Sequence, residues 1–83
     1  MKIQLKMLGD LRQHLPAGAQ FNRCELDIAV DDSVQAVVEK IQLPDEKTFL
    51  LMLNGDMVLQ ADYATTTLQA GDELVLFPPI KGG

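Results

Sequence analysis

Residues 31–44, DDSVQAVVEKIQLP, contain the pattern of an amphipathic helix. Four apolar residues recur at intervals of three and four positions, which places them on one helix face: Val34, Val37, Val38 and Ile41. Small polar residues that can cap a helix N-terminus precede them: Asp31, Asp32 and Ser33. Pro44 marks the end, because the residue before a proline avoids the α region. The sequence therefore predicts one main helix in the middle of the chain.

Two strand patterns come before this helix. Residues 2–8, KIQLKML, alternate between polar and apolar, and their inward side chains are expected to be Ile3, Leu5 and Met7. Residues 24–30, CELDIAV, alternate again, with an expected inward set of Cys24, Leu26, Ile28 and Val30. Between them, residues 9–23 contain Gly, Pro and Asn, which predict a long loop with one helical turn.

Three strand patterns follow the helix. Residues 49–53, FLLML, lead into Asn54-Gly55, a pair suited to a type I′ hairpin, and then into a short return strand. A Gly71-Asp72 turn comes before the last strand, Glu73 to Phe77. This order of elements predicts an α+β fold, in which one helix packs on one face of a mixed sheet of about five strands. The first and last strands are expected to pair at its centre.

Residues 1–77 are expected to form this domain, and residues 78–83, PPIKGG, a flexible tail. Proline cannot donate to a β-ladder and glycine loses the most backbone entropy on ordering. An extended tail of this length reaches roughly 18 Å at about 3.1 Å per residue. Whether this tail is a frayed end or a working part is the main functional question that the sequence raises.

Composition narrows the classes of function. The chain has 83 residues, of which 47% are hydrophobic and 23% charged, as expected for one globular domain. Its net charge of −5, without a cluster of Lys or Arg, argues against binding to nucleic acid or to an anionic membrane, and it favours a partner with a basic face. The N-terminus lacks the apolar run of a signal peptide, so a cytoplasmic location is expected.

An apolar patch is predicted on the side of the sheet that the helix does not cover. In the last strand Leu74 and Leu76 point one way, and Val75 and Phe77 point the other. In the strand before it, Phe49, Leu51 and Leu53 are expected inside. The outward set predicts a partner-binding patch, because exposed apolar clusters mark interfaces: Leu50, Met52, Val75 and Phe77. In the alternative, the loop GDLRQHLPAG, residues 9–18, folds over this face.

Other candidate site residues carry weaker signals. His14, the single histidine, is expected on the surface of the loop, and Cys24 is expected to be a small core hydrophobe. The Asp31-Asp32 pair is expected to cap the helix, and Asp45-Glu46 to lie in a solvated turn, since neither has the spacing of metal ligands. The sequence contains no phosphate loop, nucleophile elbow or zinc motif. No metal site and no catalytic centre are predicted.

Residues 54–83, NGDMVLQADYATTTLQAGDELVLFPPIKGG, resemble the second half of the MoaD/ThiS-type sulfur carriers. The hallmarks of that family are Asn-Gly, then Leu-x-x-Gly-Asp-Glu, then a terminal Gly-Gly. The Phe77-Pro78-Pro79 stretch is most similar to the small subunit of molybdopterin synthase. Lys81 departs from the pattern, in which a small residue precedes the glycines. The resemblance implies a ubiquitin-like β-grasp fold.

The resemblance also implies a function for the tail. The carboxylate of Gly83 would be adenylated by a ubiquitin-activating-type adenylyltransferase that uses ATP. Sulfur from a persulfide donor would then convert it to a thiocarboxylate for molybdenum cofactor biosynthesis in a larger synthase subunit. The residues inserted into the partners' active sites would be Gly82, Lys81, Ile80, Pro79 and Pro78. The chain would bind no cofactor and would not itself be an enzyme. Sulfur carriage for thiamine or cysteine biosynthesis, and ubiquitin-like protein modification, remain as alternatives.

Overall fold

The computed structural model describes residues 1–15, 21–44 and 48–79. The predicted turn at Asp45-Glu46 and the residues from Ile80 to Gly83 lie outside these ranges. The described elements, in chain order, are β1 (Lys2–Met7), the 3-10 helix η1 (Gly9–His14), β2 (Arg23–Asp27), α1 (Val34–Ile41), β3 (Leu50–Leu53), β4 (Asp56–Met57), the 3-10 helix η2 (Gln60–Asp62) and β5 (Glu73–Phe77).

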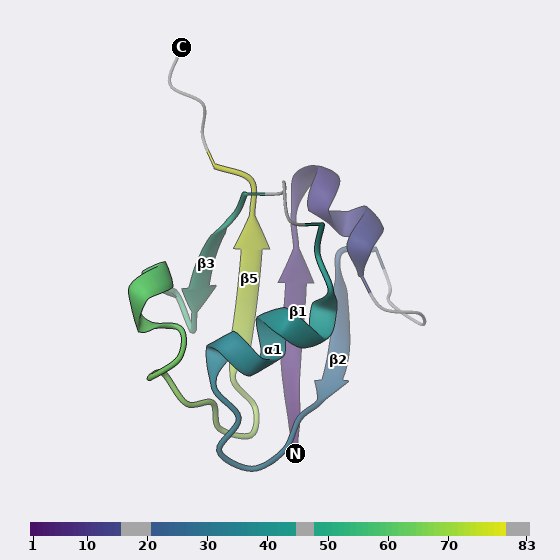
Figure 1. Ribbon diagram of the computed structural model, residues 1–83. Helices are drawn as coiled ribbons and strands as arrows, with labels where there is room; N and C mark the ends of the chain where they lie inside the picture. The colour runs from purple at the N-terminus through teal and green to yellow at the C-terminus, as the bar shows by residue number, and fades with distance from the viewer. Residues whose placement is uncertain (16–20, 45–47, 80–83) are drawn as a thin grey trace.

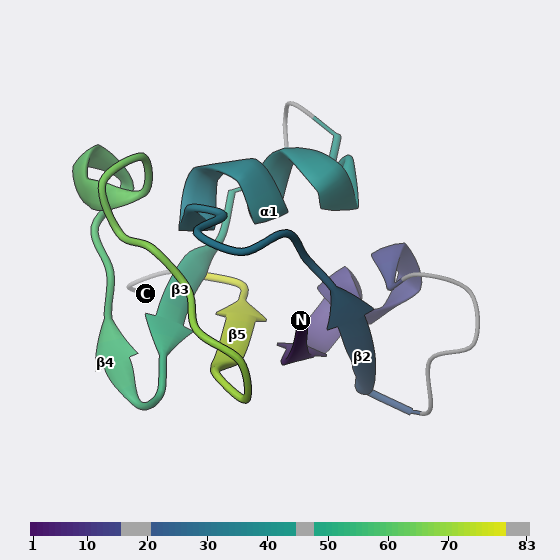
Figure 2. The same cartoon turned by 90° about the horizontal axis from the view of Figure 1, so that it is seen from below.

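The five strands form one mixed sheet in the order β2-β1-β5-β3-β4. The first and last strands pair in parallel inside the sheet, as predicted, and the other pairs are antiparallel. Helix α1 crosses one face of the sheet (Figure 1). Seen from below, α1 and η2 lie on the same side of the sheet (Figure 2). The predicted fold class of one main helix on one face of a five-stranded mixed sheet is confirmed.

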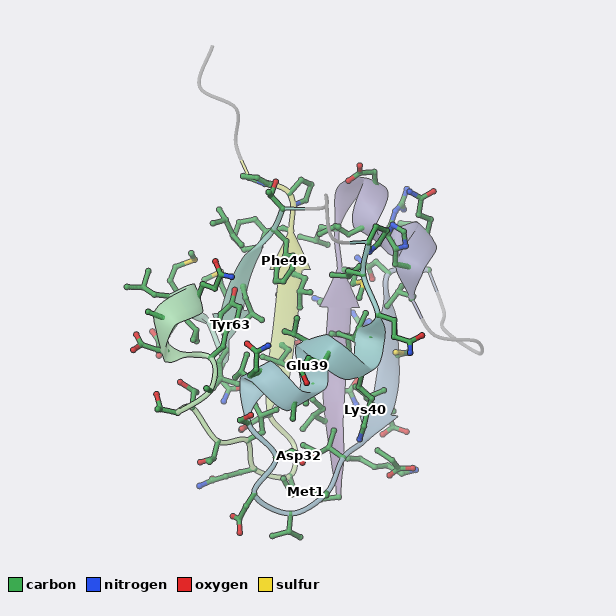
Figure 3. The ribbon with its side chains drawn as sticks, viewed as in Figure 1. Met1, Asp32, Glu39, Lys40, Phe49 and Tyr63 are labelled. Atoms are coloured by element: carbon green, nitrogen blue, oxygen red, sulfur yellow. The ribbon has the colours of Figure 1, made fainter. Side chains whose placement is uncertain are left out.

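Ser33 is the residue that caps α1. Its Oγ accepts a hydrogen bond from the backbone N–H of Ala36 at 3.1 Å. The prediction that the Asp31-Asp32 pair caps the helix is wrong. The backbone turns through a left-handed conformation at Asp31 (φ 68°), and the Asp32 carboxylate instead accepts from the N–H of Ala29 at 2.9 Å. Asp32 also lies 3.7 Å from the Lys40 ammonium, on the helix side of the molecule (Figure 3).

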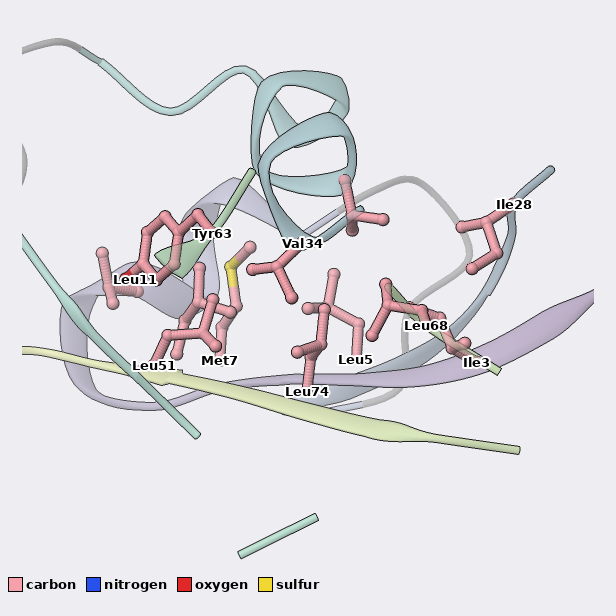
Figure 4. Packing of buried hydrophobic residues seen from close by; sticks show 12 residues of the cluster. Ile3, Leu5, Met7, Leu11, Ile28, Val34, Leu51, Tyr63, Leu68 and Leu74 are labelled. Carbon is pink, nitrogen blue, oxygen red and sulfur yellow. The ribbon is translucent and has the colours of Figure 1, made fainter. Parts of the chain in front are cut away.

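The core lies between α1 and the sheet (Figure 4). The inward residues of β1 are buried as predicted, and they meet Val34 and Val37 of the helix in one apolar cluster. Cys24 and Leu26 pack against this cluster, and Ile28 is buried within it. Val30 was predicted to face inward, and this prediction is wrong. It is 74% exposed, because β2 ends at Asp27 and the strand alternation stops there.

A pair of stacked rings and a tight hairpin turn are the other notable features of the fold. The aromatic rings of Phe49 and Tyr63 stack with centroids 6.4 Å apart (Figure 3). The predicted type I′ turn is present, with positive φ at Asn54 (51°) and Gly55 (89°). None of the helices in the described residues is long and apolar enough to cross a membrane.

Candidate functional site: an apolar sheet face beside the tail

The pairing of β3 with β5 places the predicted partner-binding patch on one surface. Leu50 lies opposite Phe77, and Met52 lies opposite Val75. Directly paired residues share a face of a sheet, and residues two apart share it along a strand. The intervening Leu51, Leu74 and Leu76 are fully buried on the helix side. The four patch residues are partly buried and lie on the opposite side of the sheet, which we call the outer face.

Met57 extends this patch and was not predicted. It pairs with Met52 across the β3-β4 hairpin, so it lies on the outer face, where it is 49% exposed. The signal for it was present in the sequence. A two-residue loop at Asn54-Gly55 fixes the register of the hairpin, and that register places residue 57 opposite residue 52.

The loop after β1 does not cover the patch with its described part. Helix η1 turns Leu11 into the core cluster on the helix side, where Leu11 is buried. The alternative in which residues 9–18 fold over the outer face is therefore wrong for residues 9–15, and residues 16–18 lie outside the described ranges. That the patch binds a partner stays a prediction.

The start of the tail is held against the end of β1. The backbone N–H of Leu8 donates to the carbonyl of Leu76 at 3.0 Å. Gly9 has a φ of +60°, and a Cβ atom built on it would lie 2.7 Å from Cγ of Pro78. Only glycine allows this close approach together with this backbone conformation. Pro78 and Pro79 are partly buried, so the tail begins from a defined place at the edge of the patch.

We expect Gly9→Ala to change the direction in which the tail leaves the domain. The left-handed backbone should cost about 1–2 kcal/mol of stability, and the new Cβ would push Pro78 away. If the tail is adenylated, as the resemblance implies, its misplacement should lower kcat/KM for that reaction by about tenfold or more. Thermal unfolding and pyrophosphate release, assayed on the same preparations, measure the two effects separately.

Gly71→Ala is the matched control. Gly71 also has a positive φ, of 87°, but nothing lies within 4 Å of a Cβ built there. This variant should lose comparable stability and keep normal adenylation. Equal losses of adenylation in both variants would show that general destabilisation, and not the tail's exit, governs the reaction.

The weaker candidate residues do not assemble into a catalytic centre within the described residues. Burial raises the pKa of the Cys24 thiol, which disfavours the reactive thiolate, and Cys24 packs beside the core as predicted. His14 is partly buried and not a surface residue, because it ends the 3-10 helix that Leu11 anchors to the core. In residues 1–15, 21–44 and 48–79, no three His, Cys, Asp or Glu side chains could hold a metal ion.

A groove of about 700 Å³ lies between α1 and the segment that includes η2, and it extends to the sheet edge, where Leu50 and Met57 contribute to its lining. Its lining includes the stacked rings of Phe49 and Tyr63 together with several glutamine side chains. Among the described residues that line the groove, Glu39 is the one carboxylate, and it accepts a hydrogen bond from Gln35 at 3.0 Å. The described lining residues include no His, Cys, Lys or Asp, so among them there is no pair of a Cys or Lys nucleophile with a histidine base.

Comparison with known proteins decides the family. A family model described as the ThiS family matches residues 17–83. The chain belongs to the ThiS family. Its membership confirms the resemblance inferred from the Asn-Gly, Gly-Asp-Glu and Gly-Gly hallmarks. No match to this ThiS-family chain is found among curated proteins.

Solved structures similar to this ThiS-family chain share its fold. A putative molybdopterin converting factor subunit 1 from Pyrococcus furiosus is 20% identical with a TM-score of 0.72, over 95% of this chain and 98% of that one. SAMP1 from Haloferax volcanii is 23% identical with a TM-score of 0.68, over 100% of both chains. A chain in the complex of subunits 1 and 2 of molybdopterin-converting factor from Helicobacter pylori is 16% identical with a TM-score of 0.66, over 100% of both. The fold of the ThiS-family chain is thus the ubiquitin-like β-grasp.

Proposed function

We propose that this protein is a cytoplasmic sulfur carrier that acts as the small subunit of molybdopterin synthase. The observation that carries the proposal is the start of the tail, where Pro78 packs on Gly9 at the end of β5, beside the outer-face patch. A partner that binds the patch would receive the tail at one fixed entry point. Membership in the ThiS family supports sulfur carriage by the tail, and the Phe77-Pro78-Pro79 stretch supports the small subunit of molybdopterin synthase.

The proposed chemistry takes place at the carboxylate of Gly83. One carboxylate oxygen attacks the α-phosphorus of ATP on an adenylyltransferase, and pyrophosphate leaves. The terminal sulfur of a persulfide donor then attacks the acyl carbon, and AMP leaves. A thiol attacks the S–S bond of the resulting acyl disulfide, which releases the thiocarboxylate and leaves the donor as a disulfide. Gly82 and Gly83 have no side chains that would obstruct these steps.

In this proposal the chain supplies binding and a reactive end, and its partners supply catalysis. ATP binds to the adenylyltransferase, and the thiocarboxylate enters the larger synthase subunit. The H. pylori neighbour, which is part of a complex of two subunits, supports a heteromeric arrangement. The tail residues from Pro78 to Gly83 would lie in the partner's active site, while the patch that includes Val75 and Phe77 would contact its surface.

Protein modification is the second candidate function, because SAMP1, described as a small archaeal modifier protein, shares the fold. A modifier must bring its terminal glycine to many target lysines. The paired prolines restrict the orientations that the tail can sample, which suits insertion into one fixed pocket better. The stiffness of the paired prolines therefore favours sulfur carriage over protein modification.

Intact-mass measurement on the protein from its native cytoplasm tests the proposal. We expect free protein with the mass increment of one sulfur in place of one oxygen, and a larger fraction of it once adenylyltransferase, ATP and persulfide donor are supplied. Conjugates linked through Gly83 to target lysines, with no thiocarboxylate at any stage, would favour the modifier instead. Transfer of sulfur to a thiamine or cysteine precursor, and not to a molybdopterin precursor, would keep the carrier and change the pathway.

A further inference from the structure

One row of side chains on the outer face crosses all five strands of the sheet. The strand registers join its members into a continuous line, from β2 through β1, β5 and β3 to β4: Arg23, Lys6, Val75, Met52 and Met57. The cationic side chains of Arg23 and Lys6 therefore lie directly beside the apolar patch, with Lys6 next to Val75. A surface that covers this row must be apolar at one end and must neutralise positive charge at the other.

The cationic end of the row is electrostatically unfavourable in the free protein. Lys6 and Arg23 lie directly opposite each other on antiparallel strands, where like charges destabilise a sheet. Arg23 is exposed and Lys6 partly so. In residues 1–15, 21–44 and 48–79 neither cation has a carboxylate within ion-pair distance. This repulsion would be relieved by an anionic group from outside the chain.

The other outward pairs between the same two strands are complementary. Lys2 lies opposite Asp27, and its ammonium is 4.0 Å from the carboxylate of Glu25. Gln4 lies opposite Glu25 and donates a long hydrogen bond to it at 3.5 Å. The one like-charge pair is thus the pair that adjoins the apolar patch. Violations of local pairing rules of this kind concentrate at functional sites.

Positive charge also accumulates nearby, at the end of the sheet from which the tail leaves. Arg12, in η1, lies over the ring of the exposed Phe21, with its guanidinium carbon 5.0 Å from the ring centre. Phe21 comes two residues before Arg23, so both arginines of the chain lie near this end. The net charge of −5 favoured a basic partner, but the row that crosses the patch has only cations as its charged members, and the carboxylates Glu25 and Glu73 of the outer face lie in the next row.

We infer that Lys6 and Arg23 form a docking element for carboxylates on the adenylyltransferase that activates the tail. This inference rests on the proposed function and adds the chemistry of its partner: an apolar surface with acidic residues along one edge. Carboxylates placed between the two cations would turn their repulsion into attraction, and so orient the partner relative to the tail. Three cations are too few for a nucleic-acid groove on a chain of this charge.

Arg23→Glu tests this docking element through two measurements that should move in opposite directions. The variant replaces the repulsive cross-strand pair with an attractive one, so the melting temperature should stay the same or rise. Affinity for the purified adenylyltransferase should fall about tenfold at low ionic strength, mainly through slower association, and the difference should shrink in high salt. Lys6→Glu should behave in the same way.

Lys40→Glu is the matched control. It makes the same change of charge on α1, on the other side of the sheet, where Lys40 pairs with Asp32 (Figure 3). Its affinity should equal that of the unchanged protein. Equal affinities for Arg23→Glu, Lys6→Glu and Lys40→Glu would overturn the docking element. It would also be overturned if the protein bound single-stranded RNA more tightly than the enzyme, and Arg23→Glu weakened only the binding of RNA.

Adenylation is measured separately from binding, so the two proposals can fail separately. A wild-type chain that binds the enzyme with Arg23-dependent affinity but is never adenylated would count against the sulfur-carrier function alone. If the wild-type protein is adenylated normally, and Arg23→Glu and Lys6→Glu leave its affinity for the enzyme unchanged, the docking element alone is wrong. Absence of both binding and adenylation would reject both.

Discussion

Removal of Gly83 is expected to abolish adenylation and to leave the melting temperature nearly unchanged. In the proposed function the carboxylate of Gly83 is the reacting group. In the shortened chain the carboxylate would sit one residue back from the reacting position, and misplacement of reacting atoms is costly. Within residues 1–15, 21–44 and 48–79, the buried core residues all lie between Ile3 and Leu76, so we expect the core not to depend on the last residue. ATP-dependent pyrophosphate release and thermal unfolding measure the two properties.

Lys81→Ser is the control for this deletion. It changes the same tail but keeps its length and both glycines, and it restores the small residue that the family pattern has at this position. Adenylation should persist in this variant. If the protein without Gly83 is still adenylated and still donates sulfur, the function does not reside in the terminal carboxylate.

Phe77→Ala is expected to weaken binding of the synthase partner by about 1–3 kcal/mol, with a smaller effect on folding. The Phe77 ring lies opposite Leu50 on the outer face, partly buried and outside the core cluster, at the point where β5 passes into the tail. An aromatic side chain in such a place suits an interface anchor. Calorimetric titration with the large synthase subunit measures the loss.

Leu76→Ala, one residue earlier, is the control, because it should lower stability more than Phe77→Ala does. Leu76 is fully buried on the helix side of the same strand. Its truncation should lower the free energy of unfolding by about 2–5 kcal/mol. A large loss of stability in Phe77→Ala, with unchanged binding, would place Phe77 functionally in the core and remove it from the interface.

Much of the candidate site could be predicted from local sequence patterns. Alternation in β3 and β5 separated Leu50, Met52, Val75 and Phe77 from their buried neighbours, because side chains along a strand point to alternate faces. The hairpin at Asn54-Gly55 was predictable from turn chemistry, and its register contained the missed Met57. Expectations were wrong where a regular element ended, as at Val30, because alternation has no meaning beyond the last paired residue.

The sequence by itself determined the main helix, the strands, most of their buried sides and the resemblance to the family, since periodicity, caps and turns depend on residues that are near neighbours in the chain. Only the tertiary structure decided which distant residues meet. The contact of Gly9 with Pro78 and the pairing of Lys6 with Arg23 join segments separated by long loops or by most of the chain. Loop length leaves strand register undetermined, so these contacts depend on how the whole sheet closes around its core.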